Sequence, residues 1–200
     1  YEEAAESGEK AYLYEMAKKA WEFGLPEEEA FALSARAAES GYPPSMLMFS
    51  RILEKNGKMA DAAAFLFAAA DALCPEALYS RALAGLSGKV VRSHEQITED
   101  LVLALSGGFA EAGYVLADLY GRGKCVPRDP ALSAKYALRA ALDGVPRAMT
   151  LIGRYALEGF GMKRDRTFAA KWLSKAAGKG DRDAADICRR ENFEFELPLS

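Results

Sequence analysis

The pentapeptide AAESG stands at residues 4–8 and again at residues 37–41, 33 positions later. Related segments rich in small residues begin at Ala69, Ala104, Ala140 and Ala176. Counted from Ala4, the successive steps are 33, 32, 35, 36 and 36 residues. A period of this length is typical of chains that use one supersecondary unit many times, each unit stacking on its neighbours to bury its apolar face. The sequence therefore predicts a repeat protein.

Residues 148–180 predict a pair of helices, because apolar residues recur at helical spacing on both sides of a Gly-rich turn. Gly159 and Gly161 supply the turn, and Asp165 is placed to cap the second helix. Residues 112–144 follow the same plan. The small and large residues expected to pack between helices of the later unit are Ala148, Ile152, Gly153, Ala156, Ala169, Trp172, Leu173 and Ala176.

The markers A-x-x-x-[LI]-[GA], G-x-G, Asp, A-x-x-W and A-A-x-x-G resemble those of the Sel1-like repeat family, which is related to tetratricopeptide repeats. This resemblance implies an all-α fold, a right-handed α-solenoid of stacked antiparallel helix pairs. It is strong over residues 112–180 and weaker over 12–73. It is weakest over 77–108, where Arg81 stands in place of an expected Leu and Asp100 in place of an expected Trp.

We expect one helical-repeat domain over residues 1–192, followed by an extended tail over 193–200. The repeats are expected near residues 12–41, 45–73, 77–108, 112–144 and 148–180, with partial repeats at 1–8 and 184–191. The tail alternates Phe193, Phe195 and Leu197 with acidic residues and then reaches Pro198. Two interpretations stay open: the tail covers the last helix pair, or it leads to another surface or a linker. The chain starts without Met and is expected to be a fragment of a longer protein.

Composition argues against several classes of function. A formal net charge of −3 gives no electrostatic reason to expect a nucleic-acid partner. Apolar runs are too short for membrane insertion, and no signal peptide is recognisable, so cytoplasm and periplasm both stay open. The three cysteines fall in different repeats and are expected to be unpaired. With one His and no nucleophile beside a base, we expect no metal site, no cofactor and no catalysis.

The expected binding surface is the concave face, which the first helix of each pair lines in tetratricopeptide-like stacks. The candidates on this face are Tyr14, Lys18, Arg51, Tyr79, Tyr114, Asp118, Arg147, Arg154 and Arg190. One row of equivalent positions includes four basic residues in an acidic chain, and Arg donates paired hydrogen bonds to carboxylates. The C-terminal half of this row is favoured. The tyrosines also suit scaffold packing, and the cations also suit an ordinary solvated surface.

The function expected from the resemblance is a non-catalytic, bacterial interaction scaffold or adaptor that binds a protein or peptide, with an acidic partner favoured by the basic row. One alternative is a regulatory or structural region of a larger multidomain protein, including a simple spacer. Another is hydrolase activity of the β-lactamase type, which is attributed to some Cys-rich relatives. The oligomeric state is left open.

Overall fold

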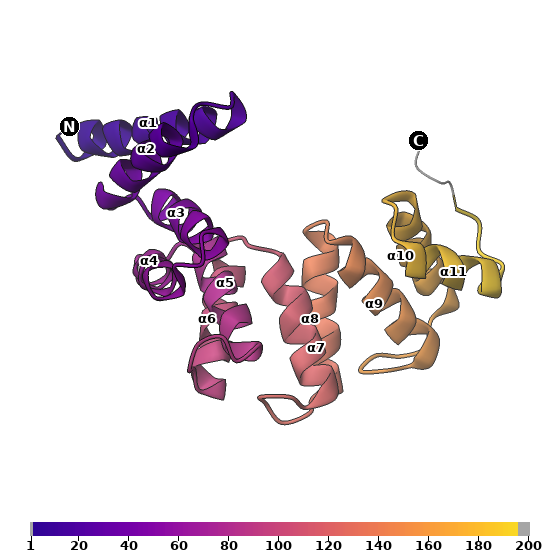
Figure 1. Cartoon of the computed structure of the whole chain (residues 1–200). Helices are drawn as coiled ribbons and strands as arrows, with labels where there is room; N and C mark the ends of the chain where they lie inside the picture. The colour runs from indigo at the N-terminus through magenta and orange to yellow at the C-terminus, as the bar shows by residue number, and fades with distance from the viewer. Residues whose placement is uncertain (1, 196–200) are drawn as a thin grey trace. The chain divides into compact units, whose positions relative to one another are not determined.

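Eleven α-helices joined by short connections make up residues 2–195, the part of the chain that this computed structural model describes (Figure 1). No β-strand occurs in that range, so the expected all-α fold is confirmed. The helices are α1 (Glu2–Glu22), α2 (Glu27–Glu39), α3 (Pro43–Lys55), α4 (Met59–Asp71), α5 (Pro75–Leu86), α6 (His94–Ser106), α7 (Glu111–Arg122), α8 (Pro130–Leu142), α9 (Pro146–Glu158), α10 (Arg166–Gly178) and α11 (Arg182–Glu191).

The helices form two compact units, Tyr1–Arg92 and Ser93–Ser200, which divide between α5 and α6. In the first unit, α1 pairs with α2 and α3 with α4, and each helix packs on the next as far as α5. In the second unit, α6 packs on α7, and the pairs α7–α8 and α9–α10 stack in order against α11. Each unit is a stack of antiparallel helix pairs, as a repeat chain requires. The single domain over 1–192 stays a prediction.

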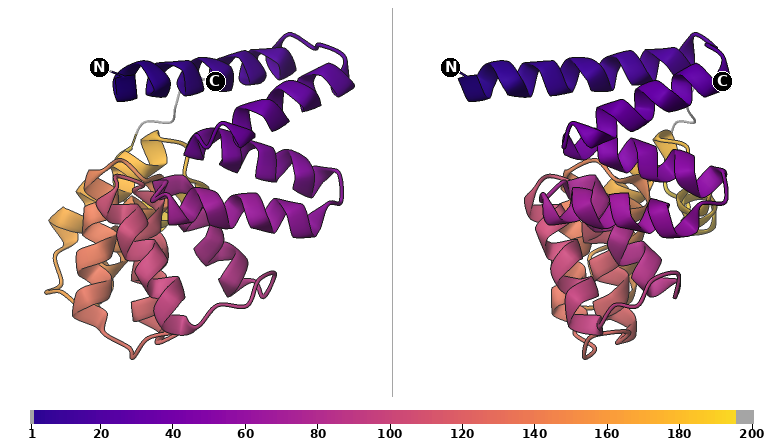
Figure 2. Two further views of the ribbon diagram at one scale, coloured as in Figure 1. Left: turned by 90° about the vertical axis from the view of Figure 1, so that its left-hand side faces the viewer. Right: turned by 60° about the vertical axis from the view of Figure 1, so that its left-hand side comes forward.

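The partial repeat expected at residues 1–8 implies a break after Gly8, and this is wrong, because α1 continues through it to Glu22 and projects beyond α2 (Figure 2). The second copy of the pentapeptide does end a helix, and Gly41 there has a φ of +80°. The residues after each copy explain the difference. Gly41 is followed by Tyr42-Pro43, and Pro lacks the N–H that would continue a helix. Gly8 is followed by Glu, Lys and Ala, which are good helix formers.

The helix starts predicted from the sequence are confirmed where capping side chains were named. The Asp165 carboxylate accepts a hydrogen bond from the backbone N–H of Phe168 at 2.8 Å. Ser93 and Gln96 form a capping box at the start of α6: Ser93 Oγ accepts from Gln96 N at 3.2 Å, and Gln96 Oε1 accepts from Ser93 N at 3.0 Å. At the beginnings of both α6 and α10, a side chain therefore accepts a hydrogen bond from the backbone N–H three residues later.

The Gly-rich turn between α9 and α10 packs against the preceding repeat. A Cβ on Gly161 would lie 1.9 Å from the backbone oxygen of Pro130, the first residue of α8. Its φ of +67° also lies in the left-handed region. Cys125 occupies the equivalent place one repeat earlier, with a φ of +68°. The turn therefore requires glycine at 161 for two reasons, conformation and close approach.

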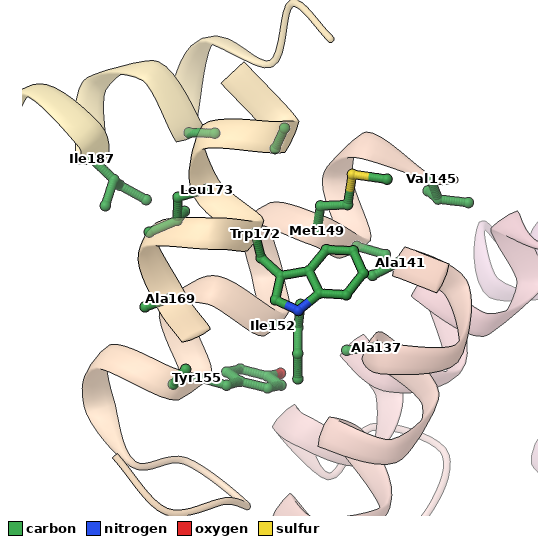
Figure 3. Packing of buried hydrophobic residues seen from close by; sticks show 14 of the residues in the cluster. Ala137, Ala141, Val145, Met149, Ile152, Tyr155, Ala169, Trp172, Leu173 and Ile187 are labelled. Carbon is green, nitrogen blue, oxygen red and sulfur yellow. The ribbon is translucent and has the colours of Figure 1, made fainter. Parts of the chain in front are cut away.

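The core of the second unit forms where small residues let helices approach and large residues fill the space between them. Trp172 is 6% exposed, as the repeat pattern predicted. Figure 3 shows its indole between Ala137 and Ala141 of α8 and Met149 and Ile152 of α9. Stacked helix pairs thus share one continuous core within this unit.

The irregular third repeat is helical, as expected, and the two units divide within it. Arg81 and Asp100 are both buried despite their charge. In the first unit the Arg81 guanidinium bonds to the Asp71 carboxylate at 2.5 Å and lies over the Phe67 ring at 5.2 Å. Burial of an arginine is tolerated because an acid and an aromatic face compensate its lost hydration.

Candidate binding surfaces

A groove of about 890 Å³ lies in the first unit, between the α3–α4 pair and α5. Its apolar lining includes Leu47, Leu66 and Leu83, and Met59 stands 59% exposed at its edge. Ser50 also lines it, but its hydroxyl donates to the backbone oxygen of Ala62 at 2.7 Å and is therefore already satisfied. The groove thus offers apolar contact more than free polar groups.

Two ion pairs cross between the walls of this groove. Arg51 of α3 bonds to the Glu76 carboxylate of α5 at 2.8 Å, and Lys89, just after α5, bonds to Glu54 of α3 at 2.6 Å. All four side chains are about half exposed, so the pairs contribute little to stability and can exchange partners. Arg51 was a candidate from the sequence, and the structure places it on the rim of the groove.

The other candidates of the first unit lie outside the groove lining. The half-buried ring of Tyr14 packs edge-on against Tyr42 with 5.8 Å between centroids. Lys18 is exposed, 3.9 Å from the Glu22 carboxylate one helical turn on. Tyr79 is half-buried on α5. The contact of Tyr14 favours the packing interpretation of that residue.

In the second unit, most of the expected basic row is engaged in local pairs. Arg154 lies 3.9 Å from Glu158 on the same helix, and Arg190 lies 3.6 Å from the adjacent Glu191. Asp118 bonds to Arg122 at 2.6 Å. Arg147 is exposed and has no ion pair among the residues that the structure describes. A partner's carboxylate would have to compete with these exposed pairs, which are weak individually.

Tyr114 is half-buried against the core of the second unit, so packing accounts for part of its surface.

A buried hydrogen-bond chain that no sequence pattern indicated links α7, α8 and α9. Ser133 Oγ donates to the backbone oxygen of Ala117 at 2.6 Å and lies 2.9 Å from the Tyr155 hydroxyl. Because the single Ser133 proton is used on Ala117, Tyr155 donates to Ser133. Burial raises the pKa of Tyr155, an effect that its hydrogen bond to Ser133 partly opposes.

Within residues 8–195, whose side chains the structure describes, no group of three His, Cys, Asp or Glu side chains is close enough to hold a metal ion. Cys74, Cys125 and Cys188 are free thiols, and burial raises the pKa of Cys188.

None of the helices in residues 2–195 is both long enough and apolar enough to cross a membrane.

The start of the tail lies over α10 and α11, the last two helices. Phe193 and Phe195 are half-buried against the core of the second unit, and Ser174 donates its hydroxyl proton to the Glu194 backbone oxygen at 2.6 Å. This agrees with the first of the two interpretations, a cover for the last pair. Leu197 and Pro198 lie outside the described residues.

Residues 110–145 and 146–181 each match the Sel1 repeat family. The match covers residues 110–181, which lie within the second unit. These bounds agree within two residues with the two units that the sequence predicted best, over 112–144 and 148–180. The resemblance stated from the sequence is confirmed.

Known structures and one curated relative extend this result. A Sel1 repeat protein from Oxalobacter formigenes is 25% identical, with a TM-score of 0.76 over 83% of this chain and 50% of that one. The protective antigen c5321 of uropathogenic Escherichia coli, which displays an SLR fold, is 21% identical with a TM-score of 0.81 over 98% and 44%. The chitin synthase regulator SKT5 of Saccharomyces cerevisiae is 35% identical over 71 residues, which are 36% of this chain and 10% of SKT5.

The likeness to c5321 covers the first unit as well and shows the same helical-repeat fold there. The chain spans half or less of the length of both solved proteins and a tenth of SKT5.

Proposed function

We propose that the chain is a non-catalytic scaffold that binds a protein or peptide partner on the surface of its helix pairs. Stacked repeats offer extended binding surfaces without any need for a catalytic centre. The two Sel1 repeats support this proposal, since the resemblance implies interaction scaffolds. The relative SKT5 is named as a regulator of an enzyme, which is consistent with a binding role for the segment that it shares.

The groove of the first unit is the observation that carries the proposal. Its apolar walls with charged residues at the rim suit the apolar side of an amphipathic partner helix. A partner carboxylate that reached Arg51 or Lys89 would replace Glu76 or Glu54 at nearly equal electrostatic cost. An acidic flank beside an apolar face is therefore the partner chemistry that we propose for this groove.

The concave-face candidates remain part of the proposal. Arg147, Arg154 and Arg190 are exposed in the second unit and carry the expected preference for an acidic partner. Arg147 supports this most directly, because it has no ion pair to break within the described residues.

A matched pair of variants tests the groove. Leu83→Glu puts a charge on the apolar wall of the groove at a position already 37% exposed, so the fold should tolerate it. Leu142→Glu makes the same change at a position that is 64% exposed in the second unit. We expect partner capture by the intact chain to fall about tenfold with Leu83→Glu, and to stay unchanged with Leu142→Glu. Equal capture by both variants, with unchanged melting temperatures, would contradict binding in the groove.

A second pair of changes tests the basic row. Charge reversal by Arg154→Glu together with Arg190→Glu should weaken capture of an acidic partner and leave the melting temperature nearly unchanged, because both side chains are exposed. If the double charge reversal leaves capture unchanged while Leu83→Glu lowers it, the groove binds the partner and the basic row is ordinary surface.

The alternative is a regulatory or structural region of a longer protein. The short share of SKT5 that aligns, 10% of its length, favours it, because a repeat segment in a long protein often serves another part. The hydrolase alternative has less support, since the Cys-rich relatives to which it belongs pair their cysteines and the three thiols here are free.

A further inference from the structure

The end of the second unit brings a basic surface against an acidic segment. Residues 163–190 include nine Lys or Arg and four Asp, with no Glu. Residues 191–196 read ENFEFE, so that Glu191 and Asn192 are followed by Phe and Glu in alternation. The first part belongs to α10, α11 and their connections, and the structure describes the second as far as Phe195. This charge complementarity lies in a chain whose net charge is only −3.

The segment reverses direction at the end of α11 and returns over the helix pair. Asn192 adopts a left-handed conformation with a φ of 55°, and the N–H of Phe193 donates to the Cys188 backbone oxygen at 2.8 Å. Residues 193–195 then continue without helical structure. The left-handed residue thus turns the chain back onto α10 and α11.

Two side chains of α10 hold this segment by hydrogen bonds. Arg166, the first residue of α10, donates to the Glu191 carboxylate at 2.7 Å and to the Glu191 backbone oxygen at 2.6 Å. Ser174 donates to the Glu194 backbone oxygen at 2.6 Å. The bond to Glu194 reaches the main chain of the non-helical residues 193–195, whereas Glu191, which Arg166 contacts through both side chain and main chain, is the last residue of α11.

Cations from both helices also lie on the two aromatic rings. The Arg166 guanidinium is 4.8 Å from the centroid of Phe193, and the Arg189 guanidinium is 5.8 Å from that of Phe195. Both rings are half-buried against the core of the second unit. Alternate aromatic positions are therefore held by cations from both helices, while the side chain of Glu194 between them is exposed.

We propose that Arg166, Ser174 and Arg189 form a binding site for an extended acidic peptide with aromatic residues at alternate positions, and that residues 191–195 are its tethered occupant. This inference rests on the proposed scaffold function and adds the chemistry of one partner. The Arg166 and Arg189 side chains are 62% and 59% exposed, so each contact is individually weak and can be exchanged. The tether compensates by holding the segment at high effective concentration. A partner peptide binds when it displaces the segment.

The test uses a fluorescent peptide with the sequence of residues 191–196, ENFEFE. Its affinity is measured for the intact chain and for a variant with Phe193→Ala and Phe195→Ala, which removes the rings of the tethered segment. We expect binding about tenfold tighter to the double variant, because the competing occupant is weakened. Adding Arg166→Gln and Arg189→Gln to that variant should reverse the gain, and the peptide ENAEAE should not bind. Equal affinity for the intact chain and the double variant, or no binding to either, would overturn the proposal.

A measurement on the unmodified chain covers the case in which the double variant does not fold. With excess ENFEFE, amide hydrogen exchange at residues 193–195 should speed up while that of α10 and α11 does not. Unchanged exchange at residues 193–195 under saturating peptide would mean that the segment is a fixed cover. Two copies of the chain could instead form a dimer by exchanging these segments, and ENFEFE would then dissociate the dimer. That result would assign the site to a second copy and overturn the proposal of a partner peptide.

The outcome is separable from that of the groove. Leu83→Glu changes only the first unit, so its effect on partner capture does not depend on residues 191–195. Failure of ENFEFE to bind, with capture still sensitive to Leu83→Glu, would remove only this inference. If Leu83→Glu lowers neither partner capture nor peptide binding, only the proposal that the groove binds the partner is contradicted.

Discussion

At the residue scale, Tyr155 shows how neighbouring repeats are joined by more than apolar contact. Its hydroxyl donates to Ser133, which in turn donates to the backbone oxygen of Ala117, so three consecutive helices share one buried chain of hydrogen bonds. Buried polar groups that satisfy one another specify a packing arrangement more narrowly than apolar side chains do. This chain fixes the register of α7, α8 and α9.

Tyr155→Phe should lower the free energy of unfolding by about 1 kcal/mol, because it removes one buried hydrogen bond and leaves the Ser133–Ala117 bond intact. Tyr120→Phe is the control: Tyr120 stacks on Tyr136, with centroids 5.7 Å apart, and no bond of its hydroxyl is part of this chain. Urea denaturation measures both variants. A loss as large in Tyr120→Phe would mean that the hydroxyl of Tyr155 has no special role.

The same residue predicts how stability depends on pH. Burial raises the pKa of Tyr155 above the ordinary value of 10.0, since the charged phenolate is disfavoured inside the fold. A raised pKa means that the folded state retains a proton that the unfolded state has lost, so stability falls as pH rises through and above 10. Tyr155→Phe should make the decline less steep. Burial also raises the pKa of Tyr136, so part of the decline should persist in the variant.

At the element scale, the connection between α9 and α10 is the part of the repeat least tolerant of a side chain. Gly161→Ala must accommodate both a φ of +67° and a Cβ 1.9 Å from the Pro130 oxygen. Gly123→Ala is the matched change, with a φ of +70° but with the Arg128 Cβ as nearest atom, at 3.0 Å. We expect Gly123→Ala to cost about 1–2 kcal/mol through conformation alone. Gly161→Ala should cost more, because backbone of the preceding repeat must move.

Thermal denaturation of the two glycine variants decides this point. Equal losses of stability would show that the turn does not press on α8, and that the close approach to Pro130 relaxes without cost.

Element by element, the sequence predicted what depends on local chemistry and periodicity. The helix pairs, the cap at Asp165 and the burial of Trp172 all followed from spacing and side-chain type. The break near Gly8 was wrong because one pentapeptide carries no conformation of its own, and the residues after it decide. The groove was not predictable, since it needs residues from three helices whose spacing only the fold determines.

The same limit applies to the expected row of cations. Arg51, Arg154 and Arg190, which occupy equivalent positions in their repeats, are exposed, and their place in one binding row stays a prediction. Their acidic neighbours were present in the sequence, but only side-chain geometry shows which of them lie within ion-pair distance. The contacts of Arg166 and Ser174 with the tail depend on the turn at Asn192, and no periodic pattern signals that turn.

At the scale of the whole molecule, the open question is whether the two units unfold as one domain. Stacked repeats couple through nearest-neighbour interfaces, so an uninterrupted stack loses its structure cooperatively. The single domain expected over residues 1–192 therefore predicts one transition. The division between α5 and α6 falls in the third repeat, where Arg81 and Asp100 stand in place of apolar residues.

The two tryptophans of the chain report on the units separately. Trp21 lies in the first unit, where its indole N–H donates to Ser34 at 2.9 Å, and Trp172 lies in the core of the second. The indole N–H signals of both can be followed by NMR in one urea titration of the unmodified chain. If residues 1–192 are one cooperative domain, the two signals should give the same midpoint, because each unit then unfolds only with the other. Midpoints that differ by more than the error of the titration would show that each unit folds alone, and that the third repeat is a boundary between two domains.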